Sequence, residues 1–121
     1  ADPAAWARYD RAVAIFCSLD AARSAAAYRR LEPALNLAYA GLGYGEGRCR
    51  DVLARAAQVL LAAPVPDEPV LLTRRGDGIY TYQDPLLEGL NEAQKHLLRL
   101  GPANQMRVQA KLRDLLAALE E

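Results

Sequence analysis

The chain has 121 residues, of which 52% are hydrophobic and 25% are charged, a composition typical of one globular domain with its own core. Fifteen acidic residues balance fifteen basic ones, so the protein lacks the overall positive field that nucleic-acid binders and anionic-membrane binders usually carry. No apolar run is long enough to span a bilayer, which excludes a membrane span in these residues and predicts a soluble chain.

Two helices are predicted before residue 43. The first begins at Asp2-Pro3, an N-cap followed by a proline at the first helical position. It runs to about Ser18 and has its apolar face on Trp6, Tyr9, Val13 and Phe16. Asp20 can cap the second helix, which is rich in alanine. Because proline disfavours α conformation in the residue before it, we expect a kink or a new helix at Pro33.

A further helix is predicted from about Glu46 to Ala62, after the glycine-rich run 41–47. Residues 64–69 contain three prolines and form an extended linker. About residues 69–83 are the only part of the sequence that reads as β structure, because two runs of aliphatic, aromatic and β-branched residues flank a glycine-containing turn. A lone two-stranded hairpin is marginal, so we expect another element to cover one face.

Two helices are predicted after the hairpin. Asp84-Pro85 begins a helix that reaches Leu100, and Gly101-Pro102 separates it from a last helix over about 103–119. The short connection predicts an antiparallel helical hairpin. The sequence therefore predicts a single mainly α domain over residues 1–121, a five- to six-helix bundle with one β-hairpin. The expected core residues are Trp6, Tyr9, Phe16, Leu35, Leu53, Leu60, Leu90, Leu97, Leu112 and Leu116.

The reactive side chains are few. His96 is the only histidine, and it lies on the side of its predicted helix opposite Leu97 and Leu90, which indicates a surface position. No ligand spacing joins it to Cys17 or Cys49. We therefore predict no catalytic, metal or cofactor site and no enzymatic activity. An enzyme that uses Cys49 as a nucleophile is the alternative, because Arg48 and Arg50 flank this thiol.

The compartment is not fixed by these residues. Cys17 and Cys49 permit one disulfide, and whether it forms depends on export. The chain opens on Ala1-Asp2-Pro3 without an initiator methionine, which indicates either a removed targeting segment or an excised piece. Together these features lean towards a secreted or periplasmic location.

Two short motifs have a simpler interpretation than a binding site. The glycine-rich run leads into a helix beside Arg48 and Arg50, where an anion can bind, but a helix precedes it and neither a GxGxxG pattern nor a Walker lysine is present. We read it as an interhelical turn. Arg75-Gly76-Asp77 is an integrin-type tripeptide at the expected hairpin tip, although a match of three residues is common by chance.

The best-supported function is a non-catalytic interaction module, an adaptor or assembly domain. A lone hairpin leaves two unpaired edges, which are templates for a partner strand or a second copy. The expected partner is another protein chain or the protein itself. The candidate partner-binding residues are Arg48, Arg50, Arg74, Arg75, Tyr80 and Tyr82.

The alternative function is a winged-helix DNA-binding domain. In this interpretation the helices on either side of the glycine-rich run form the helix-turn-helix, and residues 70–82 resemble the wing strands of such regulators. Arg48, Arg50 and Arg55 would then contact phosphates or guanine edges, and Arg74 and Arg75 would lie at the tip of the wing. The neutral net charge and the proline-rich segment before the hairpin make nucleic acid the less favoured partner.

Overall fold

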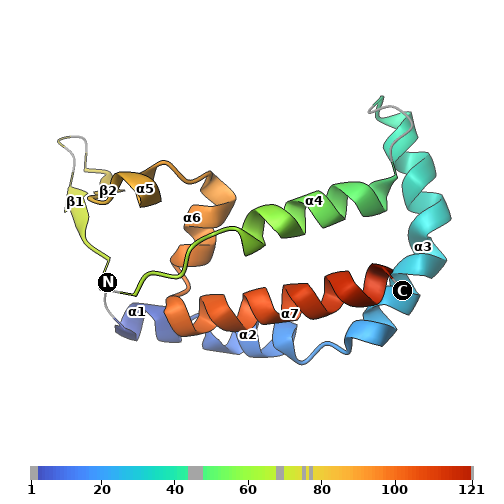
Figure 1. Ribbon diagram of the computed structural model, residues 1–121, viewed down its shortest axis with the longest axis horizontal. Coiled ribbons are helices and arrows are strands. Elements are labelled where there is room, and N and C mark those ends of the chain that lie inside the picture. Colours follow the sequence, from blue (N-terminus) through green and yellow to red (C-terminus); the bar gives the residue numbers. More distant parts are fainter. Residues whose placement is uncertain (1–2, 44–47, 68–69, 75, 77, 121) are drawn as a thin grey trace.

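The computed structural model describes residues 3–43, 48–67, 70–74, 76 and 78–120. These residues form seven helices and one two-stranded antiparallel hairpin, which confirms a mainly α fold with a β-hairpin. The molecule is elongated, with the hairpin at one end and α3 at the other (Figure 1). The elements in chain order are α1 (Pro3–Ala7), α2 (Asp10–Cys17), α3 (Ala21–Gly41), α4 (Cys49–Leu61), β1 (Leu72–Arg74), β2 (Tyr80–Tyr82), α5 (Pro85–Glu88), α6 (Glu92–Leu98) and α7 (Pro102–Glu120).

The expected first helix is two short helices, α1 and α2, with a turn at residues 8–9 between them. The Tyr9 backbone N–H donates to the Trp6 carbonyl at 3.0 Å. This bond spans three residues, whereas the bonds of a regular α-helix span four, so the chain turns more tightly here. Residues on both sides of this turn contact α7 or Gly101, the residue just before α7. The Trp6 ring lies against Gly101, and the Asp10 carboxylate accepts from the Asn104 amide at 2.9 Å. Tertiary contacts therefore set where the helix breaks.

The second helix, α3, continues through Pro33, so the new helix expected there is absent from this part of the described chain. Asp20 caps it as expected, accepting from the Arg23 backbone N–H at 2.9 Å. Two polar residues on either side of the proline, Glu32 and Asn36, are both bonded to α4. These bonds tie the residues on both sides of Pro33 to α4 and offset the donor that proline removes.

Both ends of α4 are capped by side chains from other helices. At its start, the Cys49 backbone N–H donates to the Asn36 side-chain oxygen of α3 at 2.9 Å. At its end, the Gln109 amide of α7 donates to the carbonyls of Leu60 and Ala63 at 3.1 and 3.0 Å. Gln105 donates to the following carbonyl, that of Pro64, at 2.9 Å. These bonds satisfy terminal backbone groups that the helix itself leaves unpaired.

The hairpin pairs Leu72 with Tyr82 and Arg74 with Tyr80. Short helix α5 packs against β2 and supplies the cover that a lone ribbon needs. The expected helix over 85–100 is in fact α5 and α6, because Asn91 and Gln94 form a capping box that starts a new helix.

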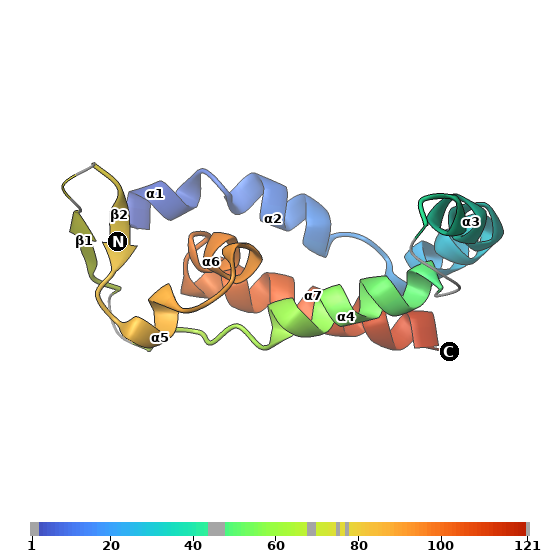
Figure 2. The same ribbon diagram turned by 90° about the horizontal axis from the view of Figure 1, so that it is seen from above.

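The last helix, α7, is the axis of the molecule. It packs against α2, α3 and α4 along most of its length, and against α6 near its start (Figures 1 and 2). The antiparallel helical hairpin expected from residues 85–119 is therefore wrong. The capping box makes α6 too short to run beside α7, and α6 instead meets it at an angle near the hairpin end (Figure 2).

The core is small and lies near the hairpin end, where Ala63, Leu87, Leu97 and Leu98 are buried together. Of the expected core residues, Leu97 is buried and Leu60 and Leu90 pack around it. Trp6, Tyr9, Phe16, Leu112 and Leu116 are half-buried. The predictions for Leu35 and Leu53 are wrong, because they are 37% and 45% exposed. Leu35 lies on α3 between Glu32 and Asn36, which bond to α4, but its own side chain remains exposed. Leu53 borders an open pocket.

Candidate functional site

Arg48 and Arg50, predicted to bind a partner, lie two residues apart at the start of α4 but in different environments. Arg48 is exposed and forms a 3.5 Å ion pair with Asp51. Arg50 is used inside the fold, where its Nε and Nη2 atoms donate to the Glu32 carboxylate at 2.8 and 3.1 Å. Its Nη1 atom also donates to the Leu119 carbonyl at 3.3 Å. Arg50 therefore joins α3, α4 and α7.

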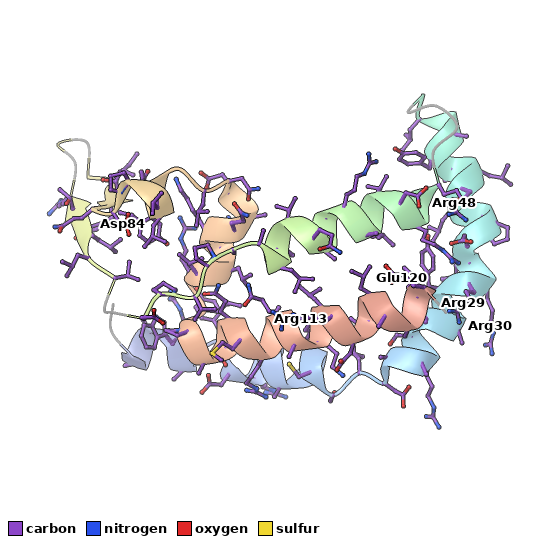
Figure 3. All side chains as sticks on the ribbon, in the orientation of Figure 1. Arg29, Arg30, Arg48, Asp84, Arg113 and Glu120 are labelled. Carbon is purple, nitrogen blue, oxygen red and sulfur yellow. The ribbon has the colours of Figure 1, made fainter. Side chains whose placement is uncertain are left out.

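The hairpin residues predicted to bind a partner lie at the other end of the molecule (Figures 1 and 3). Arg74 and Tyr80 are exposed. Tyr82 is half-buried against the core, and its backbone N–H donates to the Glu88 carboxylate at 2.8 Å. Arg75 lies outside the described residues, as does most of the tripeptide that contains it. The structure thus separates the two arginines at the start of α4 from the hairpin residues.

Polar contacts gather at the junction of α3, α4 and α7. Besides Arg50, the Arg29 guanidinium donates to the Ala118 carbonyl at 2.6 Å, and Figure 3 shows it beside the end of α7. Two cations at a helix C-terminus satisfy unpaired carbonyls and stabilise the negative end of the helix dipole. The junction fixes α7 to the two helices that flank it.

Tyr28 lies beside this junction, and its hydroxyl is buried without a hydrogen-bond partner among the described residues. Burial, followed by the neighbouring Cys49 thiol and Glu32 carboxylate, raises the pKa of Tyr28 to about 12. Because the hydroxyl forms no hydrogen bond with the residues described, its burial favours the neutral phenol over the phenolate.

We expect the raised pKa of Tyr28 to make the protein less stable in alkali. The unfolded chain loses the phenol proton near pH 10, whereas the folded protein retains it to about pH 12. Stability from this group is therefore complete below pH 10 and lost as the pH rises through 12. Urea unfolding at pH 8 and pH 11 should show a smaller loss in Tyr28→Phe than in the unsubstituted protein. An equal loss in both proteins would contradict the assignment.

An apolar pocket of about 240 Å³ opens between α3, α4 and α7 next to Tyr28. Its wall is made of leucine and alanine side chains with one serine and one tyrosine, and it is smaller than the pockets that hold most small ligands. The lining residues are Ser24, Ala25, Tyr28, Leu53, Ala57, Leu112, Leu115, Leu116 and Leu119. Apart from the Ser24 and Tyr28 side chains, the pocket offers apolar surface.

Cys49 lies beside Tyr28 and Glu32, whereas Cys17 and His96 lie on other helices. Three or more metal-ligating side chains do not meet anywhere in the part of the chain that the structure describes. His96 is exposed, as expected, and its Nδ1 atom lies 3.0 Å from the Arg99 guanidinium. The disulfide that the sequence permitted is not formed, because Cys17 and Cys49 are free thiols on α2 and α4. Among the described helices, none has the length and apolarity to cross a membrane.

Large apolar side chains are exposed at both ends of the molecule. At the hairpin end they are Leu71, Leu72, Ile79, Tyr80 and Leu86, and at the α3 end they are Leu31, Leu35, Leu37 and Leu42. The total accessible surface is 8292 Å², whereas a compact 13.2 kDa monomer exposes about 6,400 Å². The fold thus exposes about 1,900 Å² more than its mass requires.

Comparison with known proteins places the chain in a family but does not supply a function. Neither the curated proteins nor the solved structures contain a match to it. One family matches residues 1–116, nearly the whole sequence. The chain therefore belongs to the family described as "Protein of unknown function (DUF3014)".

Proposed function

We propose that the chain is a non-catalytic interaction module that acts by assembling with another protein chain. The observation that carries this proposal is the surplus of about 1,900 Å² of exposed surface, because each partner in a standard protein interface buries about 800 Å². Part of this exposed surface is apolar, because leucines are exposed at both ends of the molecule. Contiguous apolar surface of this kind usually marks an interaction site.

The two ends of the molecule offer different kinds of contact. At the hairpin, α5 packs on β2 and Glu88 accepts from its backbone, so β1 is the edge offered to a partner strand. That edge is only three residues long. At the other end, α3 presents a helical surface several turns long. Helix packing therefore offers the larger contact.

The winged-helix alternative has less support. Arg50 would have to leave Glu32 and the Leu119 carbonyl before it could contact a phosphate. The hairpin, as the wing, would have to lie beside the start of α4, but it lies at the opposite end of the molecule (Figure 1). No observation favours DNA over protein as the partner.

Two measurements on the purified chain test the proposal. Sedimentation should give a mass above the 13.2 kDa monomer, or a protein recovered by pull-down should bind again when both components are purified. Titration with duplex DNA at low salt tests the alternative, since DNA binding would weaken steeply with added salt. A strictly monomeric chain that rebinds no purified partner would falsify the interaction proposal.

A further inference from the structure

One face of α3 carries a continuous stripe of apolar side chains. The rest of the described chain leaves these side chains exposed. The members of the stripe recur at the three- and four-residue spacings of one helix face. We call this surface the α3 stripe, and it consists of Ala27, Leu31, Ala34, Leu35, Ala38 and Leu42. At 1.5 Å per residue it is about 22 Å long.

The side chains on other faces of α3 either contact α4 and α7 or lie outside the stripe. Tyr28, Glu32 and Asn36 face the junction with α4 and α7, about a third of a turn from the stripe. Leu37 is also exposed, at 77%, but it lies about a third of a turn from the stripe on the other side. The α3 stripe is therefore a distinct surface with an exposed leucine beside it for comparison.

The spacing of four side chains in the stripe is the same read in either direction. Leu31, Leu35, Ala38 and Leu42 are separated by four, three and four residues. If a second α3 packs antiparallel across a two-fold axis, Leu31 of one copy lies opposite Leu42 of the other. Leu35 then lies opposite the small side chain of Ala38, twice per interface. A two-fold interface requires this self-complementarity, since each copy presents the same surface.

We propose that the occupant of the α3 stripe is a second copy of this chain, packed antiparallel through α3. This inference rests on the proposed assembly function and names the partner and the surface. The formal net charge of zero means that two copies do not repel each other. The surplus of exposed surface exceeds the area that one copy hides in a standard dimer. A contact made mainly by one helix pair is at the small end of stable interfaces, so a micromolar dissociation constant is expected.

Sedimentation under reducing conditions tests this surface with matched variants. The unsubstituted chain should form a dimer in the micromolar range. Leu35→Glu should weaken dimerisation at least about 100-fold, because it places a carboxylate against Ala38 in a dry contact twice per dimer. Leu37→Glu adds the same charge outside the stripe and should change the dissociation constant less than about 3-fold. Circular dichroism confirms that each variant is folded.

Cross-linking tests the antiparallel register. In chains with Cys17→Ser and Cys49→Ser, a mixture of the single variants Leu35→Cys and Ala38→Cys should oxidise to a covalent heterodimer, because the two positions face each other across the axis. The cysteines are kept on separate chains because, three residues apart on one helix, they would otherwise close within one chain. Leu37→Cys alone should stay monomeric on the same treatment.

The outcomes separate this inference from the proposed function. If Leu37→Glu disrupts the dimer and Leu35→Glu does not, the interface lies outside the α3 stripe. That result overturns this inference but not the proposal that the chain assembles with another protein chain. A chain that is monomeric at every concentration overturns the self-association outright. Assembly with a different protein would then be judged by the rebinding measurement alone.

Discussion

Replacing Gly101 with alanine is expected to lower the free energy of unfolding by about 2–4 kcal/mol. Two costs act together. The residue has φ +90°, which is unfavourable for any residue with a Cβ. An added Cβ would also lie 2.5 and 2.6 Å from the Cδ2 and Cγ atoms of the Trp6 ring, so α1 would have to move away from α7. Urea unfolding followed by circular dichroism measures the loss.

Gly43 is the matched control for this substitution. It has φ +84°, but nothing lies within 4 Å of the position that its Cβ would take. Gly43→Ala should therefore cost only the backbone conformation, about 1 kcal/mol. The difference between the two variants measures the packing of Trp6. If both variants lose the same stability, the close approach of Trp6 to Gly101 is not what holds α1 in place.

Removing the Arg50 side chain is expected to lower the free energy of unfolding by about 2 kcal/mol. Arg50 and Glu32 are 23% and 18% exposed, so water solvates each of them poorly. Arg50→Ala leaves the Glu32 carboxylate without its guanidinium and removes a donor from the Leu119 carbonyl. The same urea experiment measures this change.

Arg48→Ala provides the comparison, since both arginines were predicted to bind a partner. Arg48 and Asp51 are 59% and 56% exposed, and exposed ion pairs contribute little, so this variant should stay within about 0.5 kcal/mol. Arg50→Ala with unchanged stability but weaker partner binding would return Arg50 to the interaction surface and contradict its role in the fold.

The sequence predicts the elements of this fold better than their arrangement. The hairpin and most helical segments are local patterns, and both were found near their predicted positions. The break at residues 89–91 had a local signal as well, because Asn91 and Gln94 have the spacing of a capping box. The continuity of α3 through Pro33 had no local signal in the sequence, since it depends on bonds from Glu32 and Asn36 to a helix later in the chain.

The candidate site shows the same division. Arginines beside a glycine-rich run resemble a partner-binding surface in sequence, and only the fold pairs Arg50 with Glu32. Gln105 and Gln109 were missed, although they continue the apolar spacing of Leu112 and Leu116 into the first half of α7. A buried glutamine on an apolar face needs carbonyl partners, and the exposed carbonyls at the end of α4 supply them.

The central position of α7 has a consequence for biosynthesis. The helices that precede α7 emerge first from the ribosome, yet α2, α3 and α4 each pack against residues 102–120. Until that segment has been translated, the nascent chain exposes the apolar surfaces of three amphipathic helices to chaperones and proteases. A premature stop codon near residue 100 would therefore abolish the folded state as a whole, whereas loss of a terminal helix at the periphery would only trim it.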